Sequence, residues 1–449
     1  MTPGNNRDMV ARSLAAVWHP GTQMQHLERF PLVPIERGEG VWLYDFEGKR
    51  YLDAVSSWWV NLFGHANPRI NAALKGQLEQ LEHVMLAGFT HQPVIELSER
   101  LAKLTGLGHA FYASDGASAS EIALKMSFHF WQNCHQPSKN RFVSLQGGYH
   151  GETLGALAVT DVGLFRDTYS PLLRKNLVVP APAPGGIGKP QDDSPCCIEC
   201  ALEAAAALEK LFAARHQDIA AFIVEPLVQG ASGMRMYHPE YLRRARELCT
   251  RYDIHFIADE IMTGFGRTGS MFACEQAGIK ADFLCLSKGL SGGYLPLSCV
   301  LTSDEVYAAF YDAQLTRGFL HSHSYTGNAL ACTAALATLD IFAQENVIAT
   351  NRETAQRFTQ IAQPLAQHGH VTNFRHQGMI WAFDVPSANA DFSRQAFSMA
   401  LEKGVLLRPI SNHDGNTLYF MPPYVISDAE FAYLVEITLS IVNQLGAKA

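Results

Sequence analysis

The sequence predicts an α/β protein with a mostly parallel sheet and a second, smaller domain, and two observations lead to this prediction. Short apolar segments alternate with segments of helical spacing between residues 110 and 287. Alternation over this length is typical of a doubly wound sheet with right-handed crossovers. A chain of 449 residues also exceeds the size at which one hydrophobic core usually keeps growing.

The individual elements follow from the local patterns. Residues 118–132 place Ile122, Met126 and Phe130 on one helical face, and residues 239–252 form an amphipathic helix. Residues 181–195 are rich in proline and glycine, which predicts a surface loop. Six segments have the composition of buried parallel strands: 110–114, 141–146, 176–181, 220–226, 255–260 and 282–287.

After about residue 335 the pattern changes to a long helix, short strands and a terminal helix. We therefore expect a large domain over residues 65–335 and a small α+β domain over residues 336–449. Residues 1–64 are expected to pack with the small domain.

Composition excludes several classes of function. The net charge is −8 and no block of lysine and arginine occurs, which argues against nucleic acid or an anionic membrane as the partner. No apolar run of about 18 residues and no signal-peptide pattern are present. Nine cysteines in such a chain fit a reducing compartment, so a cytoplasmic protein is expected.

Cys196, Cys197 and Cys200 include a C-x-x-C spacing that zinc sites also use. A structural zinc site usually has four ligands, and no second pair lies nearby. Thiols in a solvent-facing loop are the favoured interpretation, and no metal is expected.

Each predicted strand ends in polar residues or glycine. Ligands bind at the carboxyl ends of the strands in an open α/β sheet, so these residues predict the rim of an active site. They are Ser114-Asp115-Gly116, Gly147-Gly148-Tyr149-His150, Glu225-Pro226, Asp259-Glu260 and Lys288.

Lys288 follows an apolar run and precedes a glycine-rich turn. It is either a lysine whose amine reaches solvent or a nucleophile that forms a Schiff base. Asp259 is either a cap or ion-pair partner, or the carboxylate that pairs with the ring nitrogen of pyridoxal phosphate.

The turn in "ASDGASASE" leads into a helix, whose N-terminus favours a phosphate group. Tyr149 either packs in the core or stacks on a flat cofactor. Glycines after Lys288 leave room that a bulky side chain would take from a cofactor.

The segments "HFIADEIMTGFGRTG", "LSKGLSGGYLPLS", "GGYHGET" and "EPLVQG" resemble the motifs of class III aminotransferases, which have fold type I and use pyridoxal phosphate. Across nearly the whole chain, "DAVSSWWVNLFGHANPRI" and "LYFMPPYVI" among others resemble a subgroup in biotin synthesis. That subgroup transfers an amino group from S-adenosylmethionine to 8-amino-7-oxononanoate.

The resemblance implies roles for individual residues. Lys288 would hold the cofactor, Asp259 would pair with its ring nitrogen, and Tyr149 would stack on its ring and border the substrate. Gly116 and Ala117 would form the phosphate-binding turn. In the family homodimer, the segment of Ser322, His323 and Ser324 reaches the neighbouring subunit's site and its phosphate.

Trp58 matches a tryptophan of the substrate channel, and Arg408 matches the arginine that binds the carboxylate of the acceptor. The sequence departs from the family pattern at Ala117, where some members have serine, and at His323-Ser324, which replaces Pro-Thr. Gly21 stands where well-known members have a tyrosine that engages substrate, which leaves lysine open as an alternative amino donor.

Three other functions stay open on the sequence alone. An ω-amino acid:pyruvate aminotransferase would share most motifs, and a cofactor-free Schiff-base lyase would share Lys288. A non-catalytic binding protein could use the same sheet edge.

Overall fold

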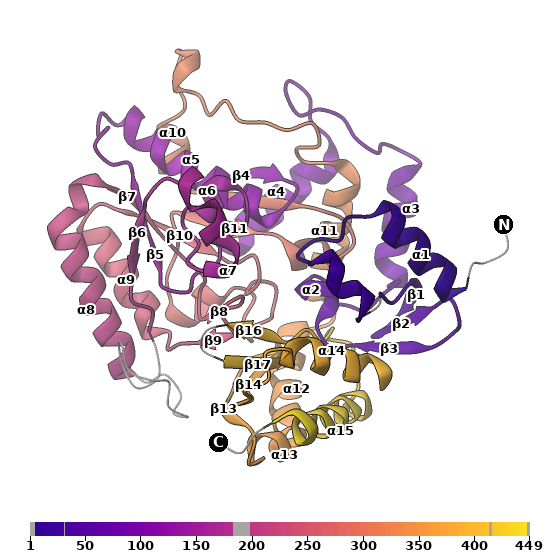
Figure 1. Ribbon diagram of the computed structural model, residues 1–449. Coiled ribbons are helices and arrows are strands. Elements are labelled where there is room, and N and C mark those ends of the chain that lie inside the picture. The colour runs from indigo at the N-terminus through magenta and orange to yellow at the C-terminus, as the bar shows by residue number, and fades with distance from the viewer. Residues whose placement is uncertain (1–4, 31, 183–197, 413–414, 447–449) are drawn as a thin grey trace. The chain divides into compact units, whose positions relative to one another are not determined.

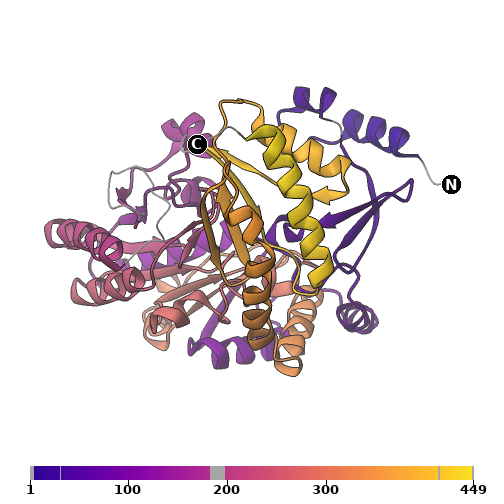
Figure 2. The same ribbon diagram turned by 90° about the horizontal axis from the view of Figure 1, so that it is seen from below.

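The chain forms two compact units. The computed structural model describes residues 5–30, 32–182, 198–412 and 415–446. The terminal unit comprises residues 1–68, 356–374 and 381–449, and the central unit comprises residues 69–355 and 375–380. Figures 1 and 2 show the ribbon from perpendicular directions.

A seven-stranded sheet forms the middle of the central unit, in the order β4-β12-β11-β10-β7-β5-β6. The fold is the α/β fold predicted, and all six predicted strands belong to this sheet. β12 was not predicted, and it runs antiparallel to β11 and to β4. The strands are β4 (His109–Ala113), β5 (Arg141–Leu145), β6 (Leu177–Val179), β7 (Ile219–Val224), β10 (His255–Asp259), β11 (Phe283–Leu286) and β12 (Ser298–Thr302).

Helices connect and cover these strands, and α8 and α9 lie side by side in Figure 1. The α-helices are α3 (Pro68–Leu78), α4 (Gln92–Thr105), α5 (Gly116–Asn133), α6 (Leu154–Leu157), α7 (Gly163–Arg166), α8 (Ile198–Arg215), α9 (Glu240–Arg251), α10 (Asp304–Ala308) and α11 (Ala329–Gln344). Short 3₁₀ helices are η2 (Asp167–Leu172), η3 (His216–Asp218), η4 (Ala273–Ala277), η5 (Lys288–Ser291) and η6 (Leu315–Arg317), and β8 (Val228–Gln229) pairs with β9 (Arg235–Met236).

The central unit extends to residue 355, beyond the expected division at 335. An ion pair of 2.6 Å between Arg100 of α4 and Asp340 of α11 ties that long helix to this unit.

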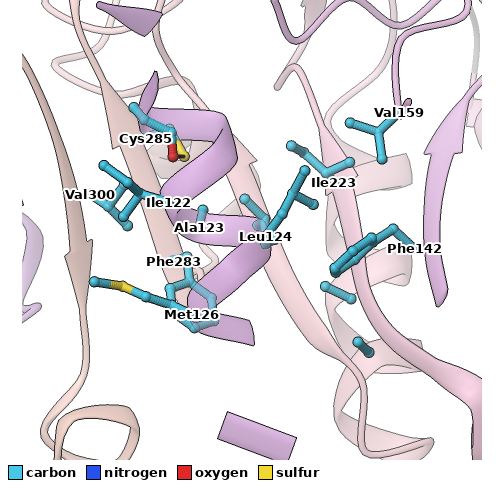
Figure 3. Close-up of a cluster of buried hydrophobic side chains, with 14 of the residues drawn as sticks. Ile122, Ala123, Leu124, Met126, Phe142, Val159, Ile223, Phe283, Cys285 and Val300 are labelled. Carbon is cyan, nitrogen blue, oxygen red and sulfur yellow. Dashed lines mark hydrogen bonds between the residues drawn. The ribbon is translucent and has the colours of Figure 1, made fainter. Parts of the chain in front are cut away.

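Packing of α5 on the sheet forms the core of the central unit (Figure 3). The predicted face of Ile122, Met126 and Phe130 is buried. Phe283 and Val300 from the strands belong to the same cluster. Burying such side chains stabilises the fold by about 1.5–3 kcal/mol each.

Two cysteines lie in neighbouring strands of the same sheet. Cys285 belongs to β11 and Cys299 to β12, and neither side chain is exposed. Burial raises the pKa of both thiols.

The terminal unit contains two four-stranded sheets. One has the order β1 (Ile35–Glu39), β2 (Trp42–Asp45), β3 (Arg50–Asp53) and β15 (Val405–Leu406), and the other has the order β13 (Thr372–Gln377), β14 (Ile380–Asp384), β17 (Gly415–Phe420) and β16 (Ile410–Asn412). Its helices are α1 (Asn6–Ala16), η1 (Met24–Glu28), α2 (Ser56–Trp59), α13 (Gln363–Ala366), α14 (Phe392–Glu402) and α15 (Asp428–Leu445), and α12 (Val347–Ile361) begins in the central unit and ends in this one.

Trp381 of β14 anchors the core of the terminal unit. Its ring contacts Phe358 of α12 and Phe431 of α15, at centroid distances of 5.8 and 5.0 Å. Phe431 also contacts Phe420 of β17 at 5.9 Å, so α15, yellow in Figure 2, packs against β14 and β17.

The cysteine prediction needs a correction. Cys200 is buried in α8 rather than exposed in a loop, because the helix begins at residue 198. Cys196, Cys197 and residues 183–195 of the predicted loop lie outside the described residues. Among the residues described, no group of three histidine, cysteine or acidic side chains could hold a metal ion, and no helix is long and apolar enough to span a membrane.

Candidate active site

The carboxyl ends of five strands converge at one edge of the central sheet. β5, β7, β10 and β11 pair in parallel, and β4 has the same direction because β12 is antiparallel to both of its neighbours. The residues after these strands therefore share one edge, as expected for an open α/β sheet.

Lys288 lies two residues after the end of β11, at the start of η5. Its φ of +45° is in the left-handed region, which is rare for a residue with a side chain. Ser287 Oγ donates to the Leu297 carbonyl at 2.9 Å and closes the turn that leads into β12. Burial lowers the pKa of Lys288, and the charges of Asp259 and Glu225 oppose this shift. A lowered pKa increases the neutral, nucleophilic fraction of the amine.

Gly292 of the same turn has a more specific role than leaving room for a cofactor. Its φ is +64°, and a Cβ atom there would lie 2.7 Å from Oγ1 of Thr338 in α11. Both the backbone conformation and the approach of α11 therefore require glycine.

Asp259, the last residue of β10, forms a buried pair with His150. The distance from Asp259 Oδ2 to His150 Nδ1 is 2.7 Å, and the two side chains are only 4% and 1% exposed. The other carboxylate oxygen accepts from Ile261 N at 3.2 Å. His150 Nε2 is buried and has no hydrogen-bond partner among the described residues.

Glu225 follows β7 and fixes the backbone around Tyr149. Its two carboxylate oxygens accept from Tyr149 N at 2.8 Å and from Gly230 N at 2.9 Å. Burial raises the pKa of Glu225 to about 7, with a further contribution from the charge of Asp259.

The phenol of Tyr149 donates to Glu152 Oε1 at 2.9 Å, and its ring contacts Phe165 at 5.5 Å. Burial, together with the charge of Glu152, raises the pKa of Tyr149. The phenol therefore stays protonated at neutral pH.

Gly116 and Ala117 begin α5, with Asp115 as the N-cap. A Cβ atom on Gly116 would lie 2.9 Å from Ile261 Cγ2, and a Cβ atom on Gly151 would lie 2.5 Å from that of Ala117. The first turn of α5 therefore packs against the neighbours of both Asp259 and His150. The N–H groups of a first helical turn have no acceptor within the helix.

Ser322, His323 and Ser324 lie on a different segment, between η6 and α11. The side chains of Ser322 and Ser324 are exposed. The Ser324 carbonyl accepts from His83 Nε2 at 2.7 Å, and His323 N donates to Thr326 Oγ1 at 3.3 Å. These hydrogen bonds fix the segment without involving Lys288 or Asp259.

The predicted substrate residues Trp58, Arg408 and Gly21 all belong to the terminal unit. The Arg408 guanidinium lies over the Trp58 ring, 5.1 Å from its centroid. A Cβ atom on Gly21 would lie 3.7 Å from Trp58 Cη2. Trp58 is 50% exposed, whereas Trp59 is 7% exposed and donates to the Tyr419 hydroxyl, so of these two rings only that of Trp58 is accessible.

Comparisons with known proteins agree with these features. The model of the class III aminotransferase family matches residues 23–442. The chain belongs to the class III aminotransferase family.

Several relatives of this aminotransferase resemble it over their full length. It is 48% identical, over 98% of both chains, to the adenosylmethionine-8-amino-7-oxononanoate aminotransferase of Helicobacter pylori. The solved structure of the enzyme with that name from Methanocaldococcus jannaschii has a TM-score of 0.89 at 34% identity, covering 98% of this chain and 100% of that one. The structure of an omega-transaminase from Thermomicrobium roseum has a TM-score of 0.90 at 30% identity, and the match covers 98% of this chain and 99% of that one.

The sheet edge of this aminotransferase fits pyridoxal phosphate, the cofactor of the family. Lys288 supplies an amine with a lowered pKa, and Asp259 supplies a carboxylate held by a histidine. The first turn of α5 supplies N–H groups beside them. The close approach of Gly151 to Ala117 leaves no room for a side chain at position 151.

The sequence places His150 and Glu225 at predicted strand ends without indicating a role for either residue. Both follow predicted parallel strands, so their positions were a usable signal. Their partners could not be predicted, because residues 150 and 259 are 109 positions apart and are brought together by the sheet.

The raised pKa of Glu225 predicts that the stability of the protein depends on pH between 5 and 7. Its folded-state pKa of about 7 exceeds the ordinary value of 4.5, so the folded protein binds more protons than the unfolded chain between these values. This group therefore contributes less stability as pH rises from 5 to 7, by about 2 kcal/mol. Urea unfolding of wild type and Glu225→Gln should show that their difference in unfolding free energy shifts by this amount in favour of the variant. A difference that stays constant over this range would contradict the raised pKa.

Proposed function

We propose that this aminotransferase transfers an amino group to the ketone of 8-amino-7-oxononanoate and forms 7,8-diaminononanoate for biotin synthesis. We propose S-adenosylmethionine as the amino donor and the cytoplasm as the location. The observation that carries the proposal is the 48% identity, over 98% of both chains, to a relative with this named activity.

The proposed cofactor is pyridoxal phosphate, which would accept the amino group of the donor and return it to the ketone of the acceptor. Lys288 would bind the cofactor covalently through its amine, and Tyr149 would stack on its ring. Asp259 would pair with the protonated ring nitrogen. The N–H groups of Gly116 and Ala117 would bind the phosphate.

The protein side chains then control protons and orientation. The lowered pKa of Lys288 supports a role in accepting and returning a proton at Nζ. His150 orients Asp259 by their hydrogen bond of 2.7 Å, which keeps one carboxylate oxygen in place. Glu225 accepts a hydrogen bond from the backbone N–H of Tyr149 and so helps to fix the position of the Tyr149 ring.

Acceptor recognition would depend on Arg408 and Trp58. A guanidinium forms two parallel hydrogen bonds with a carboxylate, and its stacking on Trp58 orients that fork. The exposed half of the indole offers an apolar surface for the aliphatic chain of the acceptor.

Homodimerisation is also part of the proposal. Ser324 and Ser322 expose their side chains, and in the family dimer this segment reaches the neighbouring site. His323 and Ser324 would then complete the phosphate site of the partner subunit, with the Ser324 hydroxyl as a donor.

An ω-transaminase is the second candidate function. The structural likeness to the Thermomicrobium roseum omega-transaminase, with its TM-score of 0.90, favours it. Measuring 8-amino-7-oxononanoate and pyruvate as competing acceptors separates the two functions.

Lys288→Ala should abolish covalent attachment of pyridoxal phosphate. Borohydride reduction of cofactor-loaded protein followed by peptide mass spectrometry should place the label on Lys288 in wild type. The matched control is Lys280→Ala, since this lysine is exposed in the same unit. Labelling of another lysine in wild type would overturn the assignment.

Arg408→Ala should lower kcat/KM for 8-amino-7-oxononanoate. The decrease should correspond to a loss of about 2–5 kcal/mol in transition-state stabilisation if the charge pair between Arg408 and the acceptor carboxylate is desolvated. Covalent cofactor attachment should be unchanged, because Arg408 has no proposed role in it. Arg394→Ala, which removes an arginine of α14 elsewhere in the terminal unit, is the control. If Arg408→Ala has the same kcat/KM as wild type, Arg408 does not take part in acceptor recognition.

The amino donor can be identified from the first half-reaction. Wild-type enzyme offered S-adenosylmethionine alone should release about one equivalent of its deaminated product per active site, measured by mass spectrometry, since each cofactor accepts one amino group. Lysine alone should release none. If lysine releases product and S-adenosylmethionine does not, lysine is the donor and the acceptor proposal is unaffected. The comparison is needed because Gly21 replaces the tyrosine that engages substrate in well-known members of the family.

A shared active site predicts complementation between two inactive variants. Ser324→Asp should place a repelling charge near the partner's phosphate, and Lys288→Ala should lose the amine. Mixed dimers contain one site in which both residues are intact, so activity should recover to about a quarter of wild type after random subunit exchange. No recovery in dimers shown to be mixed would indicate sites built from one chain.

A further inference from the structure

The turn that carries Trp58 has an unusual backbone. Ser56, Ser57, Trp58 and Trp59 have φ angles of +52°, +46°, +72° and +73°. Residues with side chains normally enter the left-handed region singly, because their Cβ atom approaches the following carbonyl oxygen. Four in succession persist only where the surrounding structure holds them.

Asp53, the last residue of β3, holds the middle of this turn. Its Oδ1 accepts from Ser57 N at 2.9 Å, and its Oδ2 accepts from Ser57 Oγ at 2.7 Å. Oδ1 also lies 3.3 Å from Val55 N. The carboxylate therefore binds both polar groups of the residue that precedes Trp58.

His65 fixes the carboxylate in turn. Its Nε2 lies 2.9 Å from Asp53 Oδ2, and its Nδ1 lies 3.2 Å from Asn61 Nδ2. Since the amide nitrogen of Asn61 is a donor, Nδ1 accepts and Nε2 donates to the carboxylate. Asp53 is not exposed at all, so it cannot contact a ligand itself.

The residues on either side of Ser57 and Trp58 are also tied down. Ser56 Oγ donates to the Met421 carbonyl at 2.7 Å, and Trp59 Nε1 donates to the Tyr419 hydroxyl at 3.0 Å. Ser57 and Trp58 between these anchors are both exposed, but the Ser57 hydroxyl is bonded to Asp53, whereas the Trp58 ring is half exposed.

Sheet register brings the turn to Arg408. β3 pairs in parallel with β15, with Asp53 opposite Leu406. The chain after Asp53 and the chain after Leu406 therefore leave the sheet at the same end. This arrangement puts the Arg408 guanidinium 5.1 Å from the Trp58 ring centroid.

We propose that Asp53 is a positioning residue for acceptor recognition: by holding Ser57 it keeps the left-handed turn, and the turn holds Trp58 beneath Arg408 as a platform for an aliphatic carboxylate. This inference rests on the proposed function, since that function supplies the carboxylate ligand. Asp53 would not contact the ligand itself, and its loss should affect the charged end of the acceptor more than the aliphatic chain, because Trp58 orients the Arg408 guanidinium.

Binding of nonanoate to the cofactor-loaded enzyme tests the proposal without turnover. The readout is quenching of tryptophan fluorescence, with Trp58→Phe as the blank, and nonanamide is the uncharged comparison ligand. Asp53→Asn leaves one acceptor oxygen in place of two, so nonanoate binding should weaken about tenfold while nonanamide binding changes less than about twofold. Arg408→Ala should show the same pattern.

Asp45→Asn is the matched control. Asp45 is another buried carboxylate of the terminal unit, and it accepts from Tyr51 and from the backbone of Lys49. Its loss should reduce stability but leave the ratio of nonanoate to nonanamide affinity as in wild type. If Asp45→Asn lowers the ratio of nonanoate to nonanamide affinity as much as Asp53→Asn does, loss of any buried carboxylate of the unit has this effect. That result would overturn the proposal.

Two substitutions of Ser57 provide a test should Asp53→Asn fail to fold. Ser57→Ala removes the hydroxyl but keeps a Cβ atom at φ +46°, whereas Ser57→Gly removes the hydroxyl and the strain together. If the hydrogen bond holds a strained turn, Ser57→Ala should weaken nonanoate binding more than Ser57→Gly. Equal binding by these two variants would overturn the proposal.

Failure of the proposed function and failure of this inference give different results. If wild type does not use 8-amino-7-oxononanoate but Asp53→Asn still loses preference for nonanoate, the function is wrong and the positioning role stands. If wild type uses that acceptor and Asp53→Asn keeps the wild-type preference for nonanoate, the positioning role is wrong and the function stands.

Discussion

Compensation of charge at the carboxyl edge of the central sheet is the constraint on which the rest of the site depends. Burial disfavours the charged form of Lys288, and the nearby carboxylates of Asp259 and Glu225 oppose that effect. Removing one member would leave an uncompensated buried charge, which typically costs about 3–5 kcal/mol. These groups lie at the carboxyl ends of β11, β10 and β7, so the order of the strands in the sheet determines which charges come together.

Backbone strain occurs at a proposed functional residue in each of the two units. Lys288 has a φ of +45°, and the turn at residues 56–59 stays in the left-handed region throughout. Each residue in this conformation lowers the stability of the fold by about 1–3 kcal/mol. The strained residues carry side chains whose direction matters for the proposed function. Both places are supported by side-chain hydrogen bonds, from Ser287 to Leu297 and from Ser57 to Asp53.

The parts of the structure that the sequence predicted are those governed by local pattern. Apolar runs marked the six strands, and the spacing of Ile122, Met126 and Phe130 marked the buried face of α5. Family motifs named Lys288 and Asp259, and the structure places both at one edge. The antiparallel direction of β12 was not predictable, because pairing between strands determines it rather than composition.

Contacts between distant residues account for the rest. The pairing of Asp53 with Ser57 is local, but the left-handed turn also needs Tyr419 and Met421, more than 300 positions later in the chain. Trp58 and Trp59 look equivalent in the sequence and differ in exposure because only Trp59 reaches Tyr419. Cys200 was assigned to a loop because it closely follows the proline- and glycine-rich segment 181–195.

The two buried cysteines beside the lysine turn make its motions measurable. Cys285 and Cys299 lie on the antiparallel strands that this turn joins, and their raised thiol pKa values together with complete burial suppress reaction with alkylating reagents in the closed state. Alkylation of either thiol thus requires local opening of this hairpin, so its rate reports the free energy of that opening. The chain thereby contains a native chemical probe of the element that carries Lys288, and comparing rates with and without cofactor measures how strongly binding rigidifies it.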